Sequence, residues 1–256
     1  MFTLGVDIGS TTSKAVILKD GQEILATSLI GAGTGTDGPG RAIEAVLAEG
    51  SLKPEEITAV YATGYGRKLL KNADGEMSEL SCHARGVHHL LPEVRTIIDI
   101  GGQDAKVLSL GADGRMTEFL MNDKCAAGTG RFLDVMAGIL QLRIEDLEKQ
   151  AALSKQTVKI SSTCTVFAES EVISQLANGV ELPDLVAGIC QSVASRVAAL
   201  AKRVGVKETV CMSGGVAKNG GVRKAMEQEL GLKITYSPMA QLMGALGAAL
   251  YAYDKS

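Results

Sequence analysis

Two cysteines lie in turns of small and polar residues, and each turn comes directly before an apolar pattern that predicts a helix. Cys125 is followed by Ala-Ala-Gly-Thr-Gly130, and Cys164 lies within Ser161-Ser-Thr-Cys-Thr165. Such turns expose backbone N–H groups, and a helix N-terminus favours negative charge, so both settings stabilise a thiolate. Thiolates bind metals and carry redox chemistry, which makes these two positions the first candidates for function.

The number of these cysteines leaves several interpretations open. Two thiolates cannot complete a four-cysteine site, but a twofold dimer brings the same patch from two chains together and supplies four ligands. A [4Fe–4S] cluster fits four thiolates, and zinc is the competing metal. A transient disulfide or two inert thiols are the plain alternatives. Cys82, Cys190 and Cys211 lie in apolar helix or strand contexts, and we predict that they are structural.

A glycine-rich turn that suits phosphate binding occurs twice. The segment from Val6 to Lys14, Val-Asp-Ile-Gly-Ser-Thr-Thr-Ser-Lys, aligns with Ile98 to Lys106, Ile-Asp-Ile-Gly-Gly-Gln-Asp-Ala-Lys, and an Asp-Gly hairpin signal follows each copy. Backbone N–H groups in such a turn bind phosphate oxygens, and a lysine adds a point charge. The repeat predicts two similar lobes, each opening with an Asp-Ile-Gly hairpin, that hold a polyphosphate between them.

The residue types in these turns suggest roles. We expect Asp7 and Asp99, at strand ends, to hold Mg²⁺ through water, and Gln103 or Asp99 to orient the attacking water, so these three are the candidate catalytic residues. A third turn, Ser213-Gly-Gly215, precedes a helix and is expected to place backbone against the adenosine or α-phosphate. The predicted nucleotide-binding residues are Gly9, Ser10, Thr11, Thr12, Ser13, Lys14, Gly101, Gly102, Gln103, Asp104, Gly128, Thr129, Gly130, Gly214, Gly215, Val216 and Gln241.

The elements that must position these residues follow from hydrophobic periodicity and turn signals. The first lobe is predicted to span residues 1–94, with strands at 2–8, 15–18 and 57–62 and helices at 40–50 and 78–91. The second lobe is predicted to span 95–237. Its expected elements are strands at 158–160, 209–212 and 234–236 and helices near 131–141, 144–153, 165–178, 182–204 and 219–230. A C-terminal segment, 238–256, is expected to pack back on the first lobe as a helix.

Composition narrows the class of protein. The chain has 256 residues, 46% of them hydrophobic, and a net charge of −3 without a basic block, so we expect neither nucleic acid nor a membrane surface as a partner. The N-terminus lacks a signal peptide pattern, and no apolar run is long enough to predict a transmembrane helix. Five scattered cysteines argue against a disulfide framework and predict a reducing, cytoplasmic setting.

The two Asp-Ile-Gly hairpins and the Ser-Gly-Gly turn, in this order, resemble the actin-like ATPase superfamily, which includes actin, sugar kinases and the Hsp70 chaperones. The resemblance spans nearly the whole chain. It implies an α/β fold of two duplicated, ribonuclease H-like lobes with mixed sheets flanked by helices. A small-molecule kinase, such as a sugar kinase, is therefore an alternative function, but it leaves both cysteine turns unexplained.

A narrower resemblance covers the cysteine turns themselves. The segments 122–134 (Asn-Asp-Lys-Cys-Ala-Ala-Gly-Thr-Gly-Arg-Phe-Leu-Asp) and 160–172 (Ile-Ser-Ser-Thr-Cys-Thr-Val-Phe-Ala-Glu-Ser-Glu-Val) look like signature segments of the activators of 2-hydroxyacyl-CoA dehydratases. The 2-hydroxyglutaryl-CoA branch of that family is most similar, and the wider family includes ATPase subunits of benzoyl-CoA reductase. The segments 98–104 and 212–217 agree with it.

This resemblance implies a homodimer with one [4Fe–4S] cluster bridged by Cys125 and Cys164 of both subunits, with ATP or ADP and Mg²⁺ as further cofactors. It implies that reduced ferredoxin or flavodoxin supplies an electron, and that ATP binding and hydrolysis change the angle between helices that run from the cluster. The electron then passes to the dehydratase at very low potential. The acyl-CoA that is dehydrated binds the partner enzyme, so this sequence does not specify it.

Overall fold

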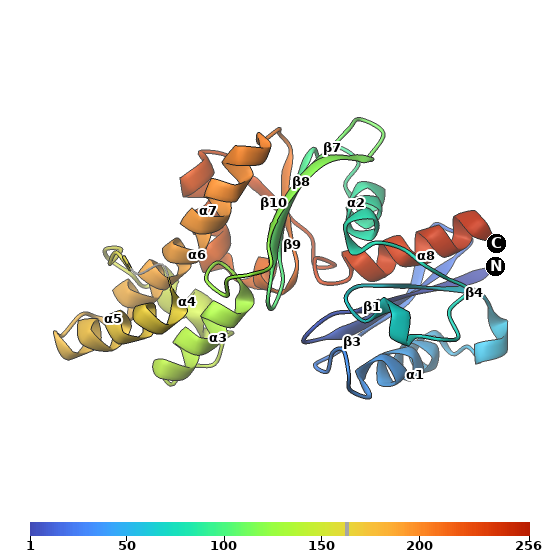
Figure 1. Cartoon of the computed structure of the whole chain (residues 1–256), viewed down its shortest axis with the longest axis horizontal. Helices are drawn as coiled ribbons and strands as arrows, with labels where there is room; N and C mark the ends of the chain where they lie inside the picture. The colour runs from blue at the N-terminus through green and yellow to red at the C-terminus, as the bar shows by residue number, and fades with distance from the viewer. Residues whose placement is uncertain (162–163) are drawn as a thin grey trace. The chain divides into compact units, whose positions relative to one another are not determined.

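The computed structural model describes residues 1–161 and 164–256, which divide into two compact units. Unit 1 comprises residues 1–95, 110–117 and 241–256, and unit 2 comprises residues 96–109 and 118–240. Each unit is built on its own five-stranded mixed sheet (Figure 1).

The sheet of unit 1 has the strand order β3-β2-β1-β4-β5. Its strands are β1 (Phe2–Ile8), β2 (Ser13–Lys19), β3 (Glu23–Ile30), β4 (Ile57–Thr63) and β5 (Gly75–Glu76). β1 pairs antiparallel with β2 and parallel with β4. The apolar residues of β2 alternate between two cores, because successive side chains of a strand point to opposite faces. Ala15 and Ile17 belong to one core, and Val16 and Leu18 belong to the other.

Helices cover both faces of this sheet. α1 (Gly38–Gly50) packs on β2 and β3, whereas α8 (Met243–Lys255) packs on β1, β2 and β4 and against α2 (Glu79–Leu90) (Figure 1). Glycines let α8 approach its neighbours closely. A Cβ on Gly247 would lie 1.9 Å from the carbonyl oxygen of Cys82, and one on Gly86 would lie 2.1 Å from that of Met243. Two short 3-10 helices, Pro54–Glu56 and Arg67–Leu69, complete the unit.

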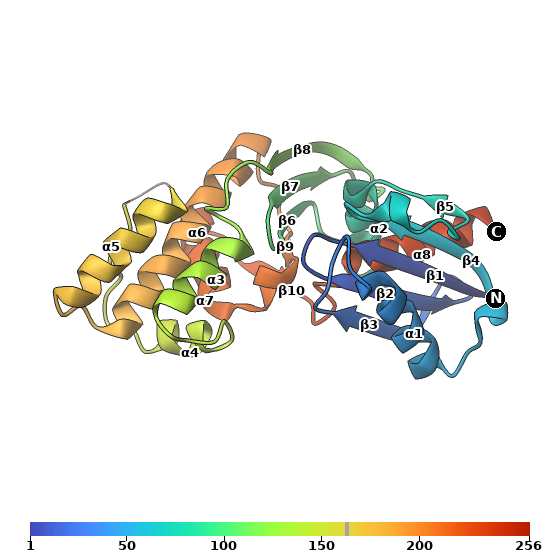
Figure 2. The same cartoon turned by 60° about the horizontal axis from the view of Figure 1, so that its bottom comes forward.

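The sheet of unit 2 has the strand order β10-β9-β6-β7-β8. Its strands are β6 (Thr96–Ile100), β7 (Ala105–Leu110), β8 (Met116–Asn122), β9 (Val210–Ser213) and β10 (Ile234–Tyr236). Its helices are α3 (Gly130–Ile139), α4 (Asp146–Ala152), α5 (Thr165–Ala177), α6 (Leu182–Val204) and α7 (Gly220–Leu230), and a 3-10 helix spans Gly215–Lys218. The helices α3, α5 and α6 pack against one another, as do α4, α6 and α7 (Figure 2).

The two sheets have the same topology. Read from the other edge, the second sheet is β8-β7-β6-β9-β10, which matches β3-β2-β1-β4-β5 strand for strand. The register repeats as well, since Asp7 pairs with Lys14 across β1–β2 and Asp99 pairs with Lys106 across β6–β7. The internal repeat that the sequence predicts is therefore confirmed as a duplicated sheet.

The strand predicted at 158–160 is wrong, because that segment has no strand assignment. The segment lies beside helix α6, and backbone N–H groups in and just before it donate hydrogen bonds to Asp184 of that helix. The N–H groups of Lys155 and Gln156 donate to Asp184 Oδ1 at 2.8 and 3.1 Å, and the Val158 N–H donates to the Asp184 carbonyl at 3.4 Å. Gly188 leaves room for the segment, since its Cβ would lie 1.9 Å from the Val158 carbonyl oxygen.

Helix α6 is the core helix of unit 2. It is long and apolar enough to cross a membrane by composition, but 67% of its apolar window is buried inside the structure. Its residues Leu185, Ile189, Val193 and Val197 join the core that also contains Phe132 of α3. The apolar content of this helix is therefore used in packing within the unit.

Candidate functional site

The turn between β1 and β2 presents backbone and hydroxyl groups at the end of a buried strand. The Gly9 N–H donates to the Thr12 carbonyl at 3.0 Å and closes the turn. A Cβ on Gly9 would lie 3.1 Å from both Lys14 Nζ and the Thr12 carbonyl oxygen, so glycine lets the lysine reach the turn. Thr11 is exposed, and Ser10 and Thr12 are partly exposed. These groups have the chemistry to bind phosphate oxygens.

A second loop, residues 32–34, contacts this turn through hydrogen bonds. This contact was not predicted from the sequence. The N–H and Oγ1 of Thr34 both donate to the Gly9 carbonyl, at 2.8 and 2.9 Å. Ser13 is buried and donates its hydroxyl to the Ala32 carbonyl at 2.8 Å, so this predicted phosphate ligand has a structural bond. A Cβ on Gly33 would lie 2.4 Å from the Ser10 carbonyl oxygen. The turn is thus fixed before any ligand binds.

The two carboxylate oxygens of Asp7 differ in their hydrogen bonding. Lys14 Nζ lies 3.1 Å from Asp7 Oδ2, and the Asp7 side chain is almost fully buried. Asp7 Oδ1 is buried and has no hydrogen-bond partner among the residues that the structure describes. A Cβ on Gly64 would lie 2.5 Å from this oxygen. A buried anionic oxygen without a partner is costly, and a cation or an ordered water beside it would offset that cost.

The second glycine turn, in unit 2, has the same backbone but a different side-chain network. The Gly101 N–H donates to the Asp104 carbonyl at 2.9 Å. Lys106 Nζ lies 2.9 Å from Asp104 Oδ2 and 3.5 Å from Asp99 Oδ2. Ser213 Oγ donates to Asp99 Oδ1 at 2.8 Å. Both oxygens of Asp99 are therefore engaged, in contrast to Asp7.

Side-chain exposure separates the members of this turn. Gln103 is exposed, whereas Asp99, Asp104 and Lys106 are buried. The exposed amide of Gln103 can reach a water or a phosphate, as expected for a residue that orients a nucleophile. The buried charges hold the turn in shape.

The third turn closely approaches the end of β6. Gly214 has φ +82, a left-handed conformation that favours glycine. A Cβ there would lie 2.4 Å from the Ile100 carbonyl oxygen and 2.9 Å from Asp99 Oδ1. Gly215 is exposed, but the Val216 side chain is buried in the core of unit 2, so only its backbone can meet a ligand. Gln241, the remaining predicted ligand, is partly exposed in unit 1, just before α8.

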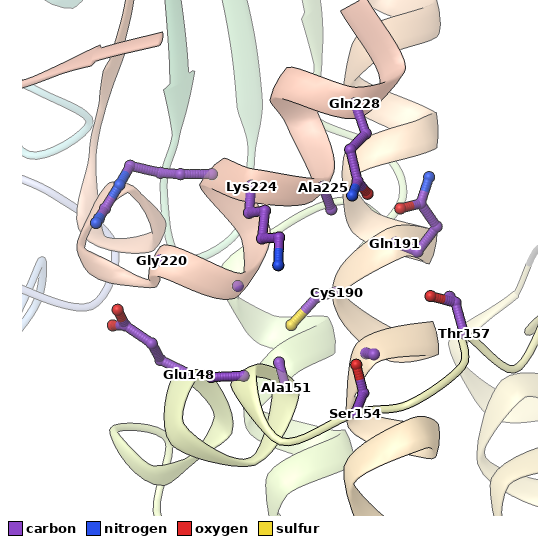
Figure 3. A pocket seen from close by; sticks show the side chains of 14 residues that line it. Glu148, Ala151, Ser154, Thr157, Cys190, Gln191, Gly220, Lys224, Ala225 and Gln228 are labelled. Carbon is purple, nitrogen blue, oxygen red and sulfur yellow. The ribbon is translucent and has the colours of Figure 1, made fainter. Parts of the chain in front are cut away.

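Unit 2 also contains a cavity of about 400 Å³ between α4, α6 and α7 that sequence reasoning missed. Figure 3 shows the side chains of Cys190 on α6 and Lys224 on α7 pointing into it. Polar groups for a heterocycle come from Ser154, Thr157, Gln191 and Gln228, and charged groups come from Glu148, Arg223 and Lys224. The signal in the sequence was the Gly220-Gly221 pair, whose Cβ positions would meet Glu148 and Cys190 Sγ.

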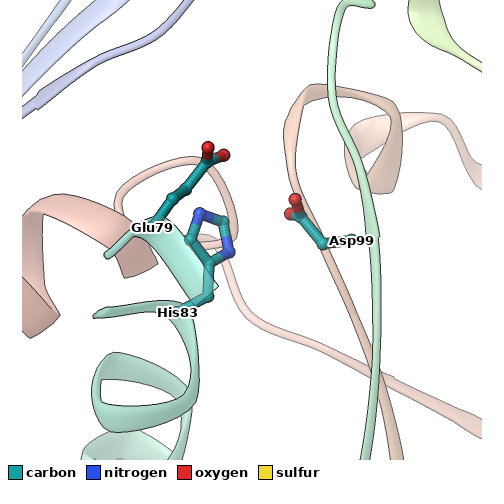
Figure 4. A group of neighbouring side chains, drawn as sticks. All are labelled: Glu79, His83 and Asp99. Carbon is teal, nitrogen blue, oxygen red and sulfur yellow. The ribbon is translucent and has the colours of Figure 1, made fainter. Parts of the chain in front are cut away.

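Figure 4 shows three further side chains that carry titratable groups. Glu79 and His83 lie one turn apart on α2 in unit 1, and Asp99 lies on β6 in unit 2. Within unit 1, a Cβ on Gly244 would lie 2.9 Å from Asp7 Oδ2 and 3.0 Å from His83 Nε2. Glycine at this position therefore leaves room for both groups.

The turn that carries Cys125 links β8 to α3. Cys125 is exposed, and its thiol is free. Gly128 has φ +88, and Thr129 is the N-cap residue of α3, with its Oγ1 donating to the Ala126 carbonyl at 2.6 Å. The thiol thus lies in an exposed turn five residues before the start of α3.

The first turn of α3 is bonded directly to the second glycine turn. The Gly130 N–H donates to the Gly101 carbonyl at 2.9 Å, and the Arg131 N–H donates to the Gly102 carbonyl at 2.7 Å. These N–H groups are therefore committed to the protein backbone. They link the Gly101–Gly102 turn to the N-terminus of α3, which begins five residues after Cys125.

Cys164 is the N-cap residue of α5, and it too is exposed with a free thiol. Of the predicted motif around it, Ser162 and Thr163 lie outside the described residues. The other three cysteines are buried, as predicted. Burial raises the pKa of the Cys82 and Cys190 thiols to about 12, mainly through desolvation of the thiolate. Among the described residues, the two exposed thiols lie at the beginnings of two helices that pack together.

Comparison with known proteins places this arrangement in context. The model of the BadF/BadG/BcrA/BcrD ATPase family matches residues 4–252. The (R)-2-hydroxyglutaryl-CoA dehydratase activating ATPase of Acidaminococcus fermentans is 59% identical, covering 100% of this chain and 98% of the relative. The activator of the 2-hydroxyisocaproyl-CoA dehydratase from Clostridium difficile, solved with bound ADPNP, superposes with a TM-score of 0.97 at 56% identity, covering 100% of this chain and 95% of that chain.

More distant structures share only the fold. A ROK family glucokinase from Streptomyces griseus has a TM-score of 0.61 at 14% identity, covering 99% of this chain and 100% of that chain. Together with the duplicated mixed sheets, this likeness confirms the actin-like fold that the three glycine turns predict.

Proposed function

The chain belongs to the BadF/BadG/BcrA/BcrD ATPase family, and from that premise we propose that it is the ATP-dependent electron-transfer activator of a 2-hydroxyacyl-CoA dehydratase. The observation that carries the proposal is the pair of exposed thiols in unit 2, one before α3 and one capping α5. A kinase of the same fold has no use for them. The relatives named above are activators of such dehydratases, at 59% and 56% identity over the whole chain.

The residues fit a [4Fe–4S] cluster shared by two copies of the chain. Cys125 and Cys164 are free and exposed, Cys164 as the N-cap residue of α5 and Cys125 five residues before α3, and cysteine thiolates are the ligands that iron–sulfur clusters take. Each chain supplies two ligands, so a twofold dimer supplies four. When bound, the cluster would supply one-electron transfer at low potential.

Exposed apolar side chains on α5, the helix that Cys164 caps, support the proposal of a homodimer. Val166, Phe167 and Ile173 are 67%, 68% and 51% exposed, which is unusual for large apolar side chains that lie on one helix. A second copy of this helix would cover them. The apolar face begins directly after the cysteine that the cluster needs.

The nucleotide is ATP or ADP with Mg²⁺. We assign phosphate binding to the backbone N–H groups of the Gly9–Thr12 turn and to Lys14. Asp7, through its unpartnered Oδ1, is the residue that holds the magnesium-bound water. In unit 2, Gln103 orients the attacking water, and the cavity between α4, α6 and α7 takes the nucleobase. Asp99 keeps the second turn in shape rather than touching the reacting groups.

The two hydrogen bonds from α3 to the Gly101–Gly102 turn support the coupling of hydrolysis to electron transfer. A change at the turn displaces the N-terminal end of α3, and with it the backbone next to Cys125. Such a displacement alters the hydrogen bonds and solvent exposure around the thiolates, which are two of the properties that set an iron–sulfur potential.

The chain works in the cytoplasm and takes its electron from a reduced ferredoxin or flavodoxin.

Purification without oxygen tests the proposal. The protein should contain about two iron atoms per chain, be brown, bleach in air and hydrolyse ATP. The variants Cys125→Ala and Cys164→Ala should lose iron and still bind nucleotide, whereas the control Cys211→Ala, at a buried thiol, should retain iron. Iron-free protein after anaerobic purification and reconstitution, or iron retained by either of the first two variants, contradicts the assignment.

A further inference from the structure

In the turn that carries Cys125, the peptide groups around the cysteine are bonded by the side chain of Asn122, at the end of β8. Asn122 Nδ2 donates to the Cys125 carbonyl at 2.8 Å and to the Ala127 carbonyl at 3.3 Å. In return, the Cys125 N–H donates to Asn122 Oδ1 at 3.2 Å. The amide thus uses both its donor and its acceptor on the backbone around one cysteine.

The segment before Cys164 is held in a comparable way by Glu171, which lies on α5. The Ser161 N–H donates to both carboxylate oxygens of Glu171, at 2.9 and 3.1 Å, and Ser161 Oγ donates to Oε1 at 2.9 Å. Hydrogen bonds to a charged acceptor are stronger than those between neutral groups. The carboxylate therefore ties Ser161 to α5, the helix that Cys164 caps.

Neither thiol is held by packing of its own side chain, since Cys125 and Cys164 are both exposed. Their positions therefore depend on the backbone, which Asn122 bonds at Cys125 and Ala127 and Glu171 bonds at Ser161. Polar groups that orient the ligands of a metal contribute strongly to its retention, and their loss typically weakens binding about 10–100-fold.

We propose that Asn122 and Glu171 are positioning residues for the cluster, one for each cysteine ligand of the chain. This inference rests on the proposed function, because it assumes that both thiols bind the cluster. The two residues differ in charge, so their removal has different electrical effects. Loss of Glu171 removes a negative charge from the helix that Cys164 caps and raises the midpoint potential, since net charge is one determinant of that potential. Loss of Asn122 leaves the charge unchanged.

The test uses anaerobically purified full-length protein and measures the rate at which a ferrous chelator removes iron. Asn122→Ala and Glu171→Ala should release iron about 10–100-fold faster than wild type. Asn122→Asp has the shape of asparagine but cannot donate to the two carbonyls, so it should behave like the alanine variant. Glu171→Gln keeps an acceptor for Ser161 and should restore slow release, while its midpoint potential stays above that of wild type.

Lys124→Ala and Ser174→Ala are the matched controls, one exposed in the cysteine turn and one exposed on α5. Both should release iron at the wild-type rate. Thermal unfolding of each variant, and hydrogen exchange of residues 120–130 and 158–172 in cluster-free protein, separate a loosened turn from an unfolded chain. The alanine variants should exchange faster only in these segments.

The outcomes distinguish this inference from the proposed function. If wild type and controls contain iron but the Asn122 and Glu171 variants release it at the wild-type rate, the positioning role is overturned while the activator assignment stands. If Glu171→Gln releases iron as fast as Glu171→Ala, the role of the carboxylate as an acceptor for Ser161 is overturned. If wild type holds no iron after reconstitution, the proposed function falls, and this inference falls with it.

Discussion

At the residue scale, the two copies of the Asp-Ile-Gly turn have diverged in their charges. In the first copy, Asp7 pairs with Lys14, and among the described residues its buried Oδ1 has no hydrogen-bond partner. In the second copy, Asp99 is bonded through both oxygens, to Lys106 and to Ser213. Equivalent positions in the repeat thus support different roles, catalytic for Asp7 and structural for Asp99.

Substitution of the two aspartates should separate these roles. Asp7→Asn should lower ATP hydrolysis about 100–1,000-fold, the usual effect of removing one preorganised charge-stabilising group, with a smaller loss of stability. Asp99→Asn should cost about 1–3 kcal/mol of unfolding free energy, because it weakens a buried hydrogen-bond network, although Lys106 keeps Asp104 as a charge partner. Hydrolysis assays and denaturant unfolding measure the two effects. Equal losses of activity and stability in both variants would show that the turns have not diverged.

The five cysteines should react in two classes in cluster-free protein. At pH 8, a thiol with a pKa of about 12 is ionised in about one molecule in ten thousand, so Cys82 and Cys190 should resist alkylation. Buried Cys211 should resist as well, while the exposed Cys125 and Cys164 should react fast. Since the folded pKa of Cys82 and Cys190 is raised, alkylation should begin only at strongly alkaline pH. Mass spectrometry after brief iodoacetamide treatment checks this, and rapid labelling of Cys82 in folded protein would contradict the burial.

At the element scale, the central feature is the bonding of α3 to the Gly101–Gly102 turn. A Cβ on Gly130 would lie 3.0 Å from the Gly101 carbonyl oxygen and 3.3 Å from Gly102 Cα, which is closer than a side chain fits without a shift. Glycine at the first position of α3 is therefore needed for the approach itself. The sequence indicated a nucleotide-binding role for this glycine, and the structure gives it a role in linking two elements.

Replacement of Gly130 by alanine should uncouple the nucleotide from the cluster. Gly130→Ala should retain iron and nucleotide binding but lose most of the ATP-dependent change in midpoint potential, because the N-terminus of α3 no longer follows the turn. Gly138→Ala is the matched control on the same helix, since its Cβ would meet nothing within 4 Å. Redox titration with and without ATP measures the effect. An unchanged ATP response in Gly130→Ala would rule out this path of coupling.

The sequence predicted most elements because each has a local signal. The Asp-Gly pairs marked the hairpins, and the spacing of Leu185, Ile189, Val193 and Val197 marked α6. The strand predicted at 158–160 failed because its apolar residues pack on α6, whose Asp184 takes up the nearby backbone N–H groups. The cavity between α4, α6 and α7 was missed for a related reason: it depends on how three helices meet, and no single helix shows that in its sequence.

The roles of Asn122 and Glu171 were not predicted because each side chain bonds to residues that are not its neighbours in the sequence. Ser161 and Glu171 lie far enough apart that only the folded turn brings them together. Asn122 was quoted as the start of a motif, but the motif does not reveal that its side chain bonds on both sides of the Cys125 peptide. The exposure of Cys125 and Cys164 agrees with the two turns that the sequence singled out, whereas the groups that bond to the backbone near them could not be predicted.

At the scale of the whole molecule, the chain consists of two units with one duplicated sheet topology. Unit 1 has the turn with the spare carboxylate oxygen, while unit 2 has the second glycine turn, the cavity and both exposed cysteines. Within unit 2, α3 is hydrogen-bonded to the second glycine turn and follows the turn of Cys125 in the chain. This arrangement supports an ATPase that acts on the cysteines of its own chain rather than a kinase that phosphorylates a substrate.

The most direct test mixes the reduced protein anaerobically with an oxidised 2-hydroxyacyl-CoA dehydratase, such as the (R)-2-hydroxyglutaryl-CoA enzyme of Acidaminococcus fermentans, and follows oxidation of the protein by its visible absorbance. Electron transfer should be fast with MgATP, should be at least about tenfold slower without nucleotide, in keeping with a coupling free energy of 1–3 kcal/mol, and should be absent in Cys125→Ala and Cys164→Ala. Electron transfer at the same rate with and without ATP, or ATP-dependent activation by the iron-free variants, would contradict the account.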